Sequence, residues 1–252
     1  MPQAIQLPVS SIAPIVGPAL QRAIEDANRS VLRLYVTAAR LGMSEPHAAS
    51  LLGVDPSFLD SVVAEVSGRE SSLAACFGFT LVVPRIRDPY TLLAIVREGA
   101  NGSTSVDALT RSFKLPVVER AMALSRDGSQ GASRPDIGRI CGPTLKRQIE
   151  VTNESVLRLY STAGRLSALD PSTASLLGVQ QSLLDVFAGE AAIEETLLAA
   201  SYGFPVFESR VHDPKKLISM IRGGSGSALS IAALTGSMSL PTVERAAHKE
   251  RG

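Results

Sequence analysis

Basic side chains gather near the end of each half of this 252-residue chain, where they are suited to binding the phosphates of a nucleic acid. They lie in and just after residues 105–120 and 230–245, two stretches that resemble a helix-turn-helix. Arginine and lysine hold phosphates, and arginine also reaches guanine edges. A solvent-exposed amphipathic terminal helix explains the same residues equally well. The candidate DNA-binding residues are Arg111, Lys114, Arg120, Arg126, Thr242, Arg245 and Lys249.

A second helix-turn-helix-like stretch, residues 48–59, has the spacing of a tight corner but the wrong charge for DNA. Gly53 can adopt a left-handed turn, and Ala49 allows two helices to approach closely. Residues 174–184 repeat the pattern. The helix that would enter the groove carries acidic residues and no lysine or arginine, so it would repel phosphates. We therefore predict a structural helix pair at this place.

No arrangement of residues indicates an enzyme, a cofactor or a metal site. The histidines His47, His212 and His248 lack metal-ligand spacing relative to Cys, Asp or Glu. The glycine-rich residues 223–227 lack the lysine and hydroxyl residue of a phosphate-binding loop. Cys76 has no evident histidine partner, which favours a buried or interface thiol over a nucleophile. The charged residues in 85–88 indicate a local ion pair beside a helix cap.

Composition places the chain among globular helical proteins with an aliphatic core. It is 45% hydrophobic and 19% charged, with no tryptophan, and its net charge of +1 gives no overall attraction to DNA or membranes. Two cysteines are too few for a secreted disulfide scaffold. No 18-residue apolar run and no signal-peptide pattern are present, so we expect no membrane span and a cytoplasmic location.

The chain contains an internal duplication with an offset of 125 residues and no gap. The segment Val31–Tyr35 is identical to Val156–Tyr160, and Ser50–Val54 is identical to Ser175–Val179. Such a period is domain-sized, so each copy can form a core of its own. We predict a first copy at residues 1–127, a linker at 128–136 and a second copy at 137–252. Tandem copies in one chain usually mimic a homodimer with a local two-fold axis.

Each copy is predicted to open with a long amphipathic helix, over Pro18–Leu41 in the first. Its apolar stripe is long enough to need a partner helix, and the equivalent stripe of the second copy is the obvious one. Asn28 and Asn153 would fix the register between the two helices, or they are solvated residues at the stripe edge. The candidate pseudo-dimer interface is Asn28, Val31, Leu34, Tyr35, Asn153, Val156, Leu159 and Tyr160.

The remaining elements of a copy are short. An acidic residue followed by proline starts a helix at residues 45–46, 55–56 and 88–89. Residues 77–84 are β-branched and aromatic, and predict one short strand. A final helical pair is expected near residues 105–112 and 116–125. The predicted fold is thus mostly α, two tandem helical domains forming a pseudo-two-fold dimer, each with at most one short strand.

The ordered motifs of each copy resemble those of FlhD, the flagellar master-regulator subunit, and its relatives on mobile elements. In the first copy they comprise residues 24–30 (IEDANRS), Arg40-Leu41, residues 52–54 (LGV), residues 73–79 (LAACFGF), Asp88 and residues 106–109 (VDAL). The order holds over nearly the whole of each copy. The resemblance implies a helical dimeric regulator that acts with a zinc-containing FlhC-like subunit, which supplies most of the DNA binding.

The chain departs from this family in several ways. The resemblance implies a bridge between subunits at Cys76, but the second copy has Ser201, so the two copies cannot bridge through it. The family's basic residue before Val106 is absent, which weakens the case for DNA contact there. We expect a transcriptional regulator subunit that is not an enzyme. It would be a fused pseudo-dimer that acts on promoter DNA with a DNA-binding partner, and it could form a larger assembly. The alternative is a helical adaptor or anti-regulator without direct DNA contact.

Overall fold

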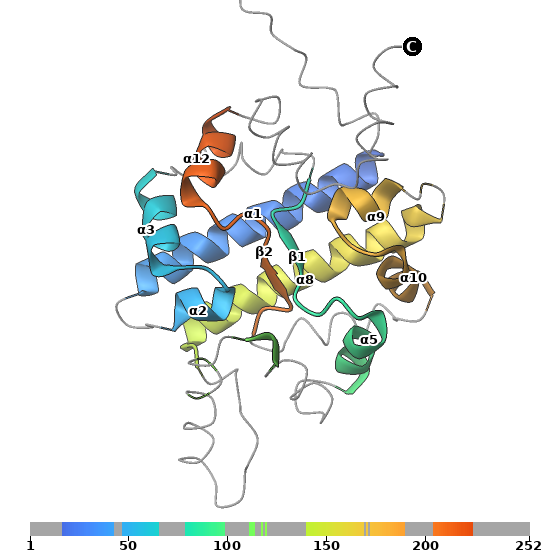
Figure 1. The fold of residues 1–252 in the computed structure, drawn as a ribbon, viewed down its shortest axis with the longest axis horizontal. Coiled ribbons are helices and arrows are strands. Elements are labelled where there is room, and N and C mark those ends of the chain that lie inside the picture. Colours follow the sequence, from blue (N-terminus) through green and yellow to red (C-terminus); the bar gives the residue numbers. More distant parts are fainter. Residues whose placement is uncertain are drawn as a thin grey trace, which may run out of the picture.

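The chain is described here by a computed structural model, which is mostly helical. It describes residues 17–42, 47–65, 79–98, 111–113, 117, 119, 140–168, 170, 172–189 and 204–223. The described elements run in the order α1, α2, α3, β1, α5 in the first copy and α8, α9, α10, β2, α12 in the second (Figure 1).

Two long helices, α1 (Pro18–Leu41) and α8 (Pro143–Ser167), form the centre of the molecule and pack against each other (Figure 1). Each begins at a proline directly after a glycine, where the missing N–H is of no consequence and φ is already helical. The predicted bounds of the first helix are confirmed. Its apolar stripe is buried from Leu20 to Ala38, which favours folding by about 1.5–3 kcal/mol for each large aliphatic side chain.

A short helix pair flanks each long helix. In the first copy α2 (Ala48–Leu52) turns into α3 (Pro56–Glu65), and α3 packs on α1. In the second copy α9 (Ser172–Leu177) turns into α10 (Gln181–Gly189), and α10 packs on α8. The turn residues Gly53 and Gly178 have φ of 75° and 70°, a left-handed conformation that residues other than glycine rarely adopt. The predicted left-handed corner is therefore confirmed.

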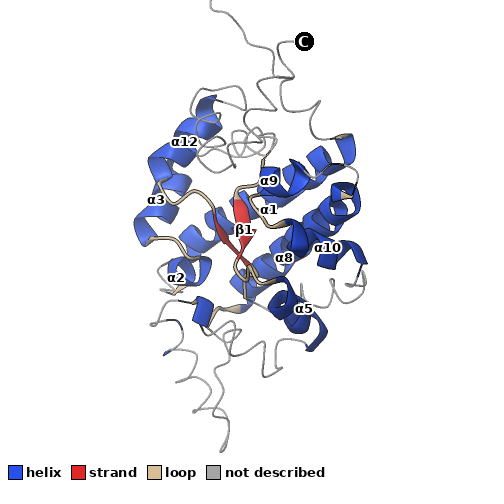
Figure 2. Cartoon of the chain, turned by 45° about the vertical axis from the view of Figure 1, so that its right-hand side comes forward, coloured by secondary structure: helices blue, strands red, loops and turns tan. Residues whose placement is uncertain are grey.

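A two-stranded antiparallel ribbon joins the two copies. Strand β1 (Val82–Pro84) pairs with β2 (Phe207–Ser209), and Val83 lies opposite Glu208. Figures 1 and 2 both show the ribbon at the middle of the molecule, among the helices of both copies. The flanking bonds are equivalent, because Arg85 N donates to Val206 O at 3.0 Å and Arg210 N donates to Leu81 O at 2.9 Å. The predicted short strand of each copy is present.

After its strand, each copy packs its next helix on the other copy. Helix α5 (Pro89–Glu98) packs on α10, and α12 (Pro214–Gly223) packs on α3 (Figure 1). Both helices start at the predicted acid-proline pair. Asp88 Oδ2 accepts the Thr91 N–H at 2.7 Å. Hydrogen bonds from the side chain and the backbone of Thr91 lower the pKa of the Asp88 carboxyl. Asp213 Oδ1 accepts the Lys215 N–H at 2.9 Å in the same way.

The described apolar core is one cluster to which both copies contribute. It is made of leucine, isoleucine, valine and alanine with a few aromatic rings, as the composition predicts. Among these rings, Tyr35 meets Phe58 edge-on at 5.4 Å between centroids. No helix in the described part of the chain is long and apolar enough to cross a membrane.

Candidate functional site

Two buried asparagines attach the strand segments to the long helices. Asn28 Nδ2 donates to Phe79 O at 2.8 Å, and its Oδ1 accepts the Leu81 N–H at 2.9 Å. Asn153 makes the equivalent bonds to Phe204 O at 2.8 Å and from the Val206 N–H at 3.1 Å. Each amide thus completes the backbone bonding of the segment that leads into the ribbon.

The candidate interface residues of the long helices are all fully buried. Asn28 and Asn153 have no exposed surface, so the alternative of a solvated asparagine is wrong. The aliphatic and tyrosine members are at most 1% exposed. These asparagine bonds run to the strand segments, a role that helix periodicity could not show because the partners lie 51 and 53 positions along the chain.

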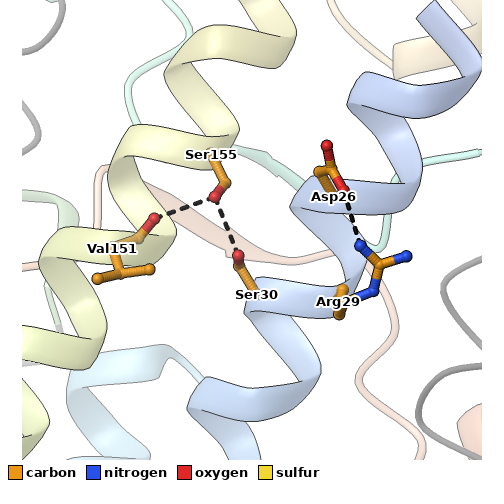
Figure 3. A network of polar contacts seen from close by, with 5 residues as sticks. All are labelled: Asp26, Arg29, Ser30, Val151 and Ser155. Carbon is orange, nitrogen blue, oxygen red and sulfur yellow. Dashed lines mark hydrogen bonds and ion pairs between the residues drawn. The ribbon is translucent and has the colours of Figure 1, made fainter.

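Serine hydroxyls at equivalent positions meet between α1 and α8. Ser30 Oγ and Ser155 Oγ are 2.9 Å apart, and Ser155 donates its hydroxyl proton to Val151 O at 3.1 Å (Figure 3). Either serine can donate in this contact, and donation from Ser30 leaves the Ser155 proton for Val151 O. Thr152 Oγ1 lies 3.3 Å from Ser30 O, across the same contact. The helices approach closely here through small polar side chains.

Arg85 is a buried charged residue that bonds several backbone carbonyls. It is 8% exposed and donates to three backbone carbonyls, each from a different segment. These are Leu51 O at 3.0 Å from Nη2, Ser112 O at 3.3 Å from Nη1 and Pro205 O at 3.2 Å from Nε. Its guanidinium also lies 4.3 Å from the ring centre of Phe113. One side chain thus joins α2, residues 111–113 and the second copy.

The predicted ion pair within residues 85–88 is wrong. Arg85 binds carbonyls, Asp88 caps α5, and Arg87 pairs with Glu208 of the opposite strand at 3.1 Å. Burial lowers the pKa of Arg85 to about 10, while the charge of nearby Glu208 raises it. The guanidinium therefore keeps its charge at neutral pH. Neighbours in sequence suggested pairing, but the ribbon supplies closer partners from the second copy.

Arg210 occupies the position equivalent to Arg85. Its Nη1 donates to Leu176 O at 3.3 Å, the carbonyl equivalent to Leu51 O. Burial lowers its pKa as well. Gly178 lies under this side chain, and a Cβ there would be 3.0 Å from Arg210 Nη2. Glycine is required at that turn for both its positive φ and the space it leaves.

Two tyrosines lie buried beside these arginines. Burial raises the pKa of Tyr35 from 10.0 to about 12, and the Ser209 hydroxyl and the Arg85 charge beside it offset part of the rise. Burial raises the pKa of Tyr160 further still. Neither tyrosine hydroxyl has a hydrogen-bond partner among the described residues. A tyrosine with so high a pKa does not act as a base or nucleophile near neutral pH.

Of the candidate DNA-binding residues, the structure describes Arg111. Its side chain is exposed, while Ser112 and Phe113 beside it contact Arg85. The others, Lys114, Arg120, Arg126, Thr242, Arg245 and Lys249, lie outside the described residues, as do Cys76 and the predicted linker. The role of Arg85 was missed from the sequence, although its repetition as Arg210 was a usable signal.

Within the described residues, no group of three or more His, Cys, Asp or Glu side chains could hold a metal ion. No family model, no curated protein and no solved structure matches the chain. The arrangement around the ribbon consists of buried groups that bind backbone carbonyls and amides. Chemically it can hold segments of both copies in place and present Arg111 at the surface.

Proposed function

We propose that the chain is a transcriptional regulator subunit in which two FlhD-like copies pair within one polypeptide, as the subunits of a homodimer do. One observation carries the pairing: the ribbon register is centred on the pair of Val83 with its own equivalent, Glu208. Val82 pairs with Ser209 and Pro84 with Phe207, so the pattern is unchanged when the two copies are exchanged. Three further pairs of equivalent residues support the same symmetry. Ser30 and Ser155 bond each other, whereas Asn28 and Asn153, and likewise Arg85 and Arg210, each bond equivalent backbone groups.

The nucleic-acid part of the proposal depends on the basic residues near the end of each copy. Arg111 presents an exposed guanidinium beside the buried Phe113. The corner helix α3 is a poor DNA-reading element, because its exposed charges, Asp55 at its start and Asp60 within it, are acidic. With a net charge of +1, the chain gains affinity for promoter DNA chiefly through a partner of the zinc-containing FlhC-like type. The proposal places the protein in the cytoplasm.

A mobility-shift titration with a pool of promoter fragments tests this proposal, with and without an FlhC-like subunit. We expect a shift that strengthens when the partner is added and weakens steeply with salt. Arg111→Ala should weaken the shifted complex by about fivefold or more. Asp60→Ala is the matched control in the corner helix and should leave binding unchanged. No shift in either condition would refute DNA binding.

The adaptor function is favoured by the same near-zero net charge and acidic corner. It predicts that replacing Lys114, Arg120, Arg245 and Lys249 together by alanine leaves partner binding and regulation intact. The regulator function predicts that this variant still binds the partner but forms a weaker DNA complex. Pull-down with the partner and mobility shift, performed on the same sample, separate the two.

A further inference from the structure

The segment around Arg111 is anchored to the protein by its own buried side chains. Phe113 is 6% exposed and Val117 is fully buried, whereas Arg111 is exposed. Phe113 also meets Phe204 of the second copy edge-on, with 6.4 Å between ring centres. The position of Arg111 therefore depends on contacts with residues of both copies.

Arg85 fills the centre of those contacts. Its guanidinium is bonded at once to Ser112 O of the segment, to Leu51 O of the first copy and to Pro205 O of the second. The planar fork of arginine bonds these acceptors from three separate nitrogens and lays a flat face on Phe113, whereas a lysine carries its three donors on one nitrogen and has no flat face. Any shift of the second copy at Pro205 moves the group that holds Ser112.

The sequence makes this connection one-sided. The positions equivalent to Arg111 and Phe113 are Gly236 and Met238, so the second copy has neither the basic side chain nor the aromatic ring. Arg210 thus has the same place in the repeat but no equivalent Arg111 to position. This gives a natural matched control within one chain.

We propose that Arg85 is a positioning residue that fixes the Arg111 segment and makes its placement depend on the pairing of the two copies. The ligand of Arg111, the phosphate backbone of duplex DNA, rests on the proposed function. The structural part of the inference, the anchoring of residues 111–113, stands apart from that function. Pairing of the copies and placement of the Arg111 segment are then energetically coupled, so that each stabilises the other.

Amide exchange of the full chain tests the structural part. Arg85→Lys keeps the charge but loses the fork, and should speed exchange in the peptide containing Arg111–Phe113 by about tenfold. Arg210→Lys should leave that peptide unchanged. Phe113→Leu removes the ring without touching the guanidinium and should act in the same direction, which covers the case that Arg85→Lys fails to fold. Unchanged exchange in the Arg85 and Phe113 variants overturns the proposal.

Fluorescence anisotropy with a labelled random-sequence duplex at low salt tests the functional part. Arg85→Lys should weaken binding about fivefold, Arg210→Lys should not, and adding Arg85→Lys to Arg111→Ala should weaken it no further. A role in general stability would instead weaken both lysine variants and add to Arg111→Ala, which overturns the positioning role. If the wild-type chain binds no duplex with or without the FlhC-like subunit, the proposed function fails, and the exchange experiment alone decides whether Arg85 positions the segment.

Discussion

The two copies share their buried polar bonds and differ in the side chains that surround them. Asparagine, serine, tyrosine and arginine recur at equivalent places around the ribbon, and the asparagines and arginines bond equivalent backbone groups. The apolar surroundings have diverged. Tyr35 packs on Phe58, but Tyr160 packs on Phe187, which is the equivalent of Val62 one helical turn along. Polar geometry is therefore more constrained than aliphatic packing, where many side chains fill the same space.

The copies also differ on the ribbon, where they meet. Val83 lies opposite Glu208, and Arg87, which pairs with Glu208, is replaced in the second copy by His212. Two second copies paired with each other would set one Glu208 opposite another, and like charges directly opposite are destabilising. The chain thus favours pairing of unlike copies over pairing of two second copies.

The largest expected effect tests the shared bonds. Asn28→Ala leaves the Phe79 carbonyl and the Leu81 N–H buried without this partner, and should lower the free energy of unfolding by about 2–4 kcal/mol. Asn153→Ala should cost a similar amount, because it breaks the equivalent bonds. Chemical denaturation measures both. A large loss in one variant with none in the other would contradict the equivalence of the copies.

The next effect tests a difference between the copies. A Cβ at Gly164 would lie 2.6 Å from Leu184 O and 2.9 Å from Ala188 N, so Gly164→Ala must push α10 away and should destabilise by about 1–3 kcal/mol. The equivalent residue is Ala39, where alanine is already accommodated. The control Ala39→Gly should cost about 1 kcal/mol through helix propensity alone. Thermal unfolding of both variants compares them, and a stabilising Gly164→Ala would refute the close approach.

The alkaline limb of stability tests the buried tyrosine. A pKa raised from 10.0 to about 12 means that the folded state keeps the Tyr35 proton after the unfolded state has lost it. The stability that Tyr35 contributes is therefore fully present below pH 10 and is lost as pH rises toward 12. Over that range the wild type should lose on the order of 2 kcal/mol more than Tyr35→Phe. Arg85 is present in both proteins, so its own titration largely cancels. Parallel curves would contradict the burial of the hydroxyl.

The helices and turns followed from the sequence because their signals are local. The apolar stripe of residues 18–41, the glycine corner at Gly53 and the cap at Asp88 each depend on neighbours a few residues away. The bonds of Asn28 and Arg85 could not be predicted, because their acceptors come from distant segments that only folding brings together. The same holds for the crossing of α5 onto α10, since nothing in a single helix tells which copy it will pack against.

The smallest expected effect concerns the ion pair across the ribbon. Arg87 is 75% exposed at its side chain, so solvent screens its attraction to Glu208. A double-mutant cycle with Arg87→Gln and Glu208→Gln should give a coupling of about 0.5 kcal/mol or less. His212, the equivalent of Arg87, provides the control, and His212→Gln should show no coupling to Glu208→Gln. A coupling of several kcal/mol for the Arg87 pair would show that this contact is far less screened.

Pairing of the two copies within one chain is tested most directly by a cross-link on the contact between α1 and α8. Ser30 Oγ and Ser155 Oγ are 2.9 Å apart, so cysteines at these positions can form a disulfide without large movement. In a chain with Cys76 and Cys141 replaced by serine, Ser30→Cys with Ser155→Cys should oxidise at high dilution. We predict a cross-linked single chain that migrates faster than its reduced form and keeps its helical spectrum. Failure to oxidise, or cross-links formed only between chains, would contradict the account.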